Sequence, residues 1–157
     1  MIKIVRTKSE HKDFQKLVAL LDEDLNVRNG IIQAQYNQYN NVASLNTVAI
    51  AYFDNKPVGC GCFKEFSDIS IEIKRMFVAS ENRGRGIAKL ILNELEKWAI
   101  ELGFSKAILE TGLKQTEAMR LYTKLGYTTI DNYGQYIGNS FSICMSKELN
   151  TSISTHS

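Results

Sequence analysis

The run Arg83-Gly84-Arg85-Gly86 stands where an apolar segment ends and an amphipathic one begins. The first amides of a helix have no partner within the helix and lie at the positive end of its dipole, so they bind phosphate readily. Glycine lets a ligand approach the main chain because it carries no Cβ, and arginine supplies charge suited to phosphate oxygens. The run therefore predicts a cradle for a pyrophosphate group at the start of a helix.

Two common nucleotide-binding patterns do not fit this run. A P-loop has a lysine followed by serine or threonine after its second glycine, and no such pair follows Gly86. The dinucleotide pattern requires glycine where Lys89 stands, and it belongs after the first strand of a domain. A glycine-rich turn with solvated arginines explains the run equally well when it is taken alone.

Alternating strands and helices must position this run. The strands are expected at residues 2–5, 47–53, 58–66, 69–78, 105–111, 127–130 and 141–149. A first helix is expected after the strand at residues 2–5 and should end near residue 25. Further helices are expected at residues 31–36, 87–102 and 115–126. The alternation indicates a single α/β domain with a mixed sheet over residues 1–149, followed by a polar tail at 150–157.

Composition and charge exclude several classes of function. The formal net charge is +2 and no long basic run occurs, so nucleic acid is not the expected partner. No apolar run approaches the roughly 18 residues that cross a bilayer, so no membrane partner is expected. The N-terminal segment is typical of a strand rather than of a secretion signal, so we expect a cytoplasmic protein.

The cysteines and histidines do not form the pattern of a metal site. Side-chain alternation places Cys60 and Cys62 on the same face of an expected strand, and Cys144 is far from both in the sequence. The only histidines are His11 and His156. We therefore expect reduced cysteines packed in the core and no bound metal.

Two segments together resemble the GNAT superfamily of N-acetyltransferases. "RMFVASENRGRGIAKLIL" resembles the acetyl-CoA-binding motif, whose core is met by Arg83, Gly86 and Ala88. "TEAMRLYTKLGY" is similar to the later motif of the superfamily. Gln115 departs from the pattern, since many members carry asparagine there. The resemblance implies a mixed, mostly antiparallel sheet of about seven strands flanked by about four helices and splayed between the fourth and fifth strands.

The resemblance also implies how acetyl-CoA binds. The backbone amides of residues 85–88 should hold the pyrophosphate, and the main chain of residues 76–78 should pair with the pantetheine arm and steady the acetyl carbonyl. Tyr122 matches the tyrosine that often protonates the departing thiolate, although a core aromatic explains it as well. The expected coenzyme contacts are Met76, Phe77, Val78, Arg83, Gly84, Arg85, Gly86, Ile87, Ala88, Gln115, Ala118 and Tyr122.

An amine must lose a proton before it can attack a thioester, so a carboxylate near the acetyl group is expected. Glu72 is the first candidate for this base, because alternation places it on the same strand face as Met76 and Val78. The alternative is that Glu72 pairs with a lysine on a solvated face. Glu110, at the end of the next strand, is the second candidate.

The acceptor-binding residues are less distinct in the sequence. Asp24, Arg28, Glu110, Tyr133 and Tyr136 are the candidates, since acids and tyrosines suit an ammonium group and arginine suits a carboxylate. A solvated helix end explains the acids equally simply. We expect direct transfer of the acetyl group to a small amine or amino acid.

Two alternatives to a small-molecule acetyltransferase remain. One is an acetyltransferase for protein lysines or N-termini, and the other is a non-catalytic acetyl-CoA-binding module. A homodimer is common in the superfamily and is an expectation by resemblance alone.

Overall fold

A computed structural model describes residues 1–29 and 45–149. For residues 24–29 it describes the backbone only. The strands form one mixed sheet in the order β1-β2-β3-β4-β5-β7-β6. The strands are β1 (Ile2–Thr7), β2 (Val48–Phe53), β3 (Lys56–Glu65), β4 (Ser70–Val78), β5 (Lys106–Gly112), β6 (Thr128–Ile130) and β7 (Ser142–Glu148). The α-helices are α1 (Lys12–Asn29), α3 (Ile87–Glu101) and α4 (Thr116–Lys124), and 3-10 helices lie at Ser80–Asn82 and Gly134–Tyr136.

The expected order of elements is confirmed where the structure describes the chain. The expected helix at 31–36 and the polar tail at 150–157 lie outside the described residues. Helix α1 continues to Asn29 rather than ending near residue 25, since no glycine or proline interrupts residues 12–29. Over the described ranges, no helix is long and apolar enough to cross a membrane.

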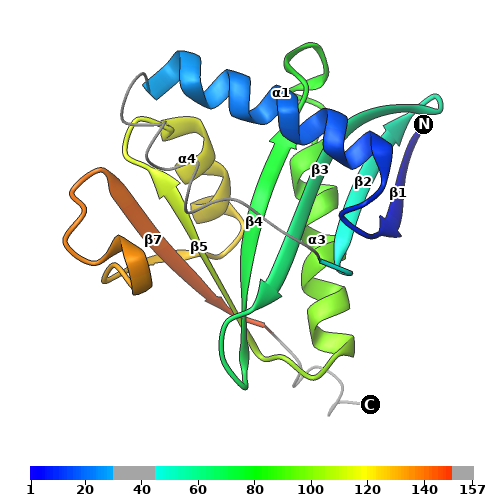
Figure 1. Ribbon diagram of the computed structural model, residues 1–157. Helices are drawn as coiled ribbons and strands as arrows, with labels where there is room; N and C mark the ends of the chain where they lie inside the picture. Colours follow the sequence, from blue (N-terminus) through cyan, green and yellow to red (C-terminus); the bar gives the residue numbers. More distant parts are fainter. Residues whose placement is uncertain (30–44, 150–157) are drawn as a thin grey trace. The chain divides into compact units, whose positions relative to one another are not determined.

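The first of two compact units comprises residues 1–63 and 74–95. Strands β1, β2 and β3 are antiparallel neighbours, and the turn between β2 and β3 has positive φ at Asp54 and Asn55, as the short "DNKP" link requires. Helix α1 packs on these strands (Figure 1). The buried cluster there contains Phe14, Leu17, Leu21, Val48, Ile50, Cys60, Cys62 and Phe77.

Strand β3 presents glycines on one face and cysteines on the other. A Cβ on Gly59 would come within 2.9 Å of the Phe77 carbonyl oxygen and 3.0 Å of Ile91 on α3, so only glycine fits there. A Cβ on Gly61 would lie 2.5 Å from Met76 Sδ. The glycines therefore let α3 approach the strand, while the thiols pack under α1.

The second unit comprises residues 64–73 and 96–157, of which the last eight lie outside the description. β4 and β5 pair in parallel, with Ser70 opposite Lys106 and Glu72 opposite Ile108. β7 pairs antiparallel with the whole of β5 and also with β6. The mixed sheet is thus confirmed, whereas the splay beyond the paired residues of β4 and β5 stays a prediction.

Candidate active site

The glycine-rich run forms a turn that only glycine adopts easily. Gly84 and Gly86 have φ of +85° and +77°, and a Cβ on either would meet no atom within 4 Å. Helix α3 begins directly afterwards at Ile87, and its first backbone bond runs from Leu90 N to Gly86 O at 3.2 Å. The amides before Leu90 are therefore the ones that an α-helix leaves for a ligand. The turn has the conformation and the open approach that a pyrophosphate cradle needs.

The two arginines of the turn have different surroundings. Arg83 Nε donates a hydrogen bond to the Val78 carbonyl at 2.8 Å, and its guanidinium lies 5.8 Å from the Phe77 ring centroid. Arg85 lies over the Phe53 ring at 4.8 Å. Arg83 therefore ties the turn to the end of β4, a role that the sequence did not indicate. Both residues are exposed, so they retain the capacity to attract an anion.

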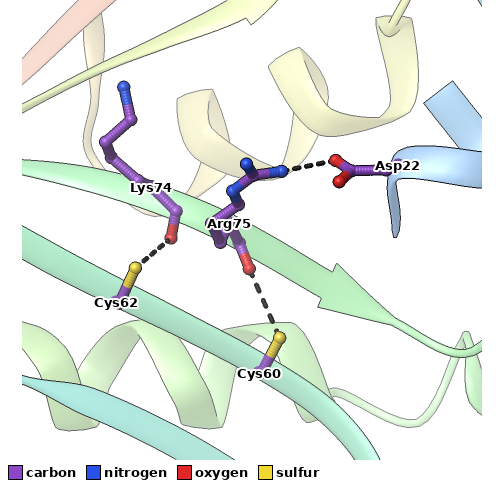
Figure 2. Close-up of polar contacts among 5 residues, drawn as sticks. All are labelled: Asp22, Cys60, Cys62, Lys74 and Arg75. Carbon is purple, nitrogen blue, oxygen red and sulfur yellow. Dashed lines mark hydrogen bonds and ion pairs between the residues drawn. The ribbon is translucent and has the colours of Figure 1, made fainter. Parts of the chain in front are cut away.

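The main chain of β4 is distorted just before the segment expected to bind the pantetheine arm. Arg75 has φ of +59°, the left-handed region that side chains other than glycine rarely adopt. The Cys62 and Cys60 thiols donate to the carbonyls of Lys74 and Arg75 at 3.4 and 3.5 Å (Figure 2). Beyond Val78, Ala79 N donates to Val58 O at 2.8 Å. A left-handed residue within a strand is typical of a β-bulge, which frees backbone groups for a ligand.

The thiols in this region are chemically quiet. Burial raises the pKa of the Cys60 thiol, and the neighbouring Cys62 raises it further. All three cysteines are free and buried, as expected. Among the side chains of residues 1–23 and 45–149, no cluster of metal-ligating groups occurs.

Glu72 lies in a buried carboxylate–tyrosine cluster of the second unit. Its side chain is 5% exposed, so Glu72 does not lie on a solvated face, but it does form an ion pair with a lysine, Lys64, as the alternative expects. Tyr133 Oη donates to Glu72 Oε2 at 2.9 Å. Lys64 Nζ lies 3.9 Å from Oε1, beyond hydrogen-bond distance. A buried carboxylate with one oxygen held by a phenol is suited to accept a proton.

Two aromatic rings pack against the tyrosine that binds this carboxylate. The Tyr133 ring meets Phe66 edge-on at 5.1 Å and Tyr136 at 5.6 Å. Burial and the Glu72 charge raise the pKa of Tyr133, and burial with the charges of Glu110 and Glu72 raises that of Tyr136. The second candidate base, Glu110, thus belongs to the same cluster. The sequence indicated these residues singly and missed the Tyr133–Glu72 bond.

Tyr122 lies on α4, is buried, and meets the Tyr127 ring edge-on at 5.8 Å. Burial and the Glu110 charge raise the pKa of Tyr122, so its hydroxyl stays protonated at neutral pH. A protonated phenol can serve as an acid, and a buried ring can serve as core. Both interpretations of Tyr122 therefore stand on the geometry.

Gln115 uses its side-chain oxygen within the chain. Oε1 accepts hydrogen bonds from Thr111 Oγ1 at 2.8 Å and Gly112 N at 3.0 Å, which closes the turn between β5 and α4. Ala118 follows on the first turns of α4 and is half-buried. The carbonyl end of Gln115 thus has a structural partner, so any coenzyme contact would come from its amide nitrogen.

The structure does not test the two acceptor-binding candidates on α1. The side chains of Asp24 and Arg28 lie outside the described residues. Asp22, two residues before Asp24, forms an ion pair with Arg75 Nη1 (Figure 2). The apolar spacing of Val18 and Leu21 could have indicated that Asp22 borders the packed face of the helix.

Comparisons with known proteins agree with this geometry. The model of the acetyltransferase (GNAT) family matches residues 14–127. The chain is 36% identical to IAA acetyltransferase of Azospirillum brasilense over 59% of this chain and 61% of that protein. It is 29% identical to an uncharacterised N-acetyltransferase, YsnE, of Bacillus subtilis over 63% and 67% of the two chains. The matched stretch thus spans less than two thirds of the Azospirillum relative.

Two solved structures share the fold. A proposed acyl-CoA N-acyltransferase from Klebsiella pneumoniae superimposes with a TM-score of 0.80 at 25% identity, over 95% of this chain and 98% of that one. The PaiA N-acetyltransferase of Thermoplasma acidophilum, solved with coenzyme A, gives a TM-score of 0.71 at 17% identity over 94% and 99%. With the family model covering most of the sequence, the chain belongs to the acetyltransferase (GNAT) family.

Proposed function

We propose that the protein is an N-acetyltransferase that moves the acetyl group of acetyl-CoA directly to a primary amine of a small molecule or amino acid. The observation that carries the proposal is the glycine turn, whose Gly84 and Gly86 leave an open approach to the start of α3. The coenzyme A in the Thermoplasma neighbour and the family match support the same ligand.

The proposed reaction assigns one proton transfer to each of two side chains. Glu72 accepts a proton from the ammonium form of the acceptor, directly or through one water. The amine nitrogen then bonds to the acetyl carbon, the carbon–sulfur bond of the thioester breaks, and the nitrogen releases its second proton to water. Tyr122 donates its phenolic proton to the departing thiolate. Exchange with solvent restores the proton of Tyr122 and removes that of Glu72.

The cradle is tested by Gly86→Val with Gly103→Val as a matched control. Both glycines have positive φ and open space at the Cβ position, so both variants carry similar backbone strain. Gly86→Val is expected to lose the thermal stabilisation that acetyl-CoA gives, and Gly103→Val is expected to keep it. Stabilisation retained by folded Gly86→Val would remove the cradle assignment.

The acceptor class is tested by coenzyme-A thiol release with amines, amino acids and lysine peptides. Release with amines or amino acids is the expected result. Release with peptides alone would favour a protein acetyltransferase. Stabilisation by acetyl-CoA without release from any acceptor would favour a binding module.

A further inference from the structure

Arg75 is a buried cation in the first unit, next to the main chain assigned to the acetyl group. It lies on β4 immediately before Met76, and its side chain is 6% exposed. Its Nη1 pairs with Asp22 on α1, and that carboxylate is 35% exposed (Figure 2). The positive charge therefore has a partner on the helix side of the guanidinium.

A second nitrogen of the same guanidinium has no hydrogen-bond acceptor among the described residues. Arg75 Nε is buried and has no hydrogen-bond partner among the described residues. Buried polar groups are nearly always bonded, so one that is not calls for an explanation such as a ligand. The Nε–H group can only donate a hydrogen bond, so its ligand must supply an acceptor such as an oxygen atom.

The backbone at Arg75 adopts an energetically unfavourable conformation. Its φ of +59° is a strained conformation, and the Cys60 thiol donates to its carbonyl at 3.5 Å. Strain of this kind collects at ligand clamps and active sites. A surface ion pair with Asp22 alone would require neither the buried Nε nor the strained backbone.

From these observations we infer that Arg75 binds the carboxylate of the acceptor, so that the substrate is an amine that also carries a carboxylate, as an amino acid does. The inference rests on the proposed function and names its acceptor class. The planar guanidinium matches the two oxygens of a carboxylate, and Nη1 stays with Asp22. Asp22 balances the charge of Arg75 before binding and offers an anion to the ammonium of the incoming zwitterion.

The test compares each amino acid with its own carboxamide, which keeps the amine and removes the negative charge. Thiol release is measured for both, together with the thermal stabilisation that each gives to the protein saturated with coenzyme A. The wild-type protein should prefer the acid by roughly 10-fold or more in kcat/KM. Arg75→Gln should bring that ratio close to one, mainly through KM for the acid, and should keep its stabilisation by acetyl-CoA.

Two further variants keep the test decisive. Asp22→Asn leaves Arg75 without its internal anion and should strengthen the preference for the acid. Arg28→Gln, which removes the other arginine considered for this role, should leave the preference unchanged. A preference lost in Arg28→Gln but kept in Arg75→Gln would overturn the inference, as would equal use of acid and carboxamide by the wild type.

The outcome also separates this inference from the proposed function. Thiol release from carboxylate-free amines with no preference for acids refutes the role of Arg75 and leaves the acetyltransferase proposal intact. If no amine supports release, stabilisation of the coenzyme-A-bound protein still decides. Stabilisation by acids over carboxamides that depends on Arg75 supports the site, and equal or absent stabilisation refutes it.

Discussion

Two buried glutamates of the second unit have the same kinds of neighbour. Tyr127 donates to Glu96 at 2.8 Å, and Tyr133 donates to Glu72 at 2.9 Å. A lysine also faces each carboxylate. Lys147 Nζ lies 2.8 Å from Glu96, whereas Lys64 Nζ lies 3.9 Å from Glu72.

The difference between the lysines fits the roles that we propose for the two carboxylates, structural for Glu96 and catalytic for Glu72. Lys147 is 26% exposed and forms a direct bond, so Glu96 has a cation and a phenol in contact. Lys64 is 46% exposed and forms only the longer ion pair with Glu72. The same three residue types thus form a close contact at Glu96 and a longer ion pair at Glu72.

The largest expected effect comes from Glu72→Gln, which keeps shape but removes the proton acceptor. Turnover at neutral pH should fall by roughly 100- to 10,000-fold. The loss should shrink as pH rises, because the amine then arrives deprotonated and needs the base less. Turnover against pH for both proteins checks this. Parallel profiles with equal rates would eliminate Glu72 and make Glu110 the next candidate.

Tyr122→Phe should have the next largest effect on rate. The ring that meets Tyr127 remains, and only the hydroxyl is lost. Turnover should fall by roughly 10- to 100-fold while stabilisation by acetyl-CoA survives. The measurement is single-turnover acetylation, in which chemistry limits the rate. An unchanged rate would assign Tyr122 to the core together with Tyr127.

Glu96→Gln should act on stability instead. Lys147 would lose its charged partner, although its exposure lets water replace part of the bond. The free energy of unfolding should fall by about 1–3 kcal/mol, with turnover per folded molecule unchanged. Denaturant unfolding and assays at low temperature check the two parts. A loss of turnover that matches Glu72→Gln would end the distinction between the carboxylates.

The smallest effects are expected from the paired tyrosines. Tyr127→Phe should lower the free energy of unfolding by about 1 kcal/mol and leave turnover unchanged. Tyr133→Phe should cost a similar amount and also reduce turnover several-fold, because Glu72 would lose a hydrogen bond that orients it. Equal turnover in the two variants would show that Tyr133 does not position Glu72.

The sequence predicted features that depend on neighbouring residues. The positions of Gly84 and Gly86 can be predicted because a left-handed turn before a helix requires glycine locally. The order of strands and helices along the chain followed from apolar periodicity. The bonds from Tyr133 to Glu72 and from Arg75 to Asp22 join residues 61 and 53 positions apart, so no local pattern encodes them. The left-handed backbone at Arg75 has no glycine to signal it, which is why the bulge was expected from resemblance only.

The buried thiols allow local and global unfolding of the protein to be measured from their rate of chemical modification. Cys60 and Cys62 belong to the first unit and Cys144 to the second, and all are covered in the folded chain. A thiol reagent can modify them only during local or global unfolding. With Cys60 and Cys62 changed to alanine, the labelling rate would measure opening around β7 alone, and with Cys144 changed it would measure opening around β3. Cysteine labelling can thus compare how often each unit opens without introducing a new cysteine.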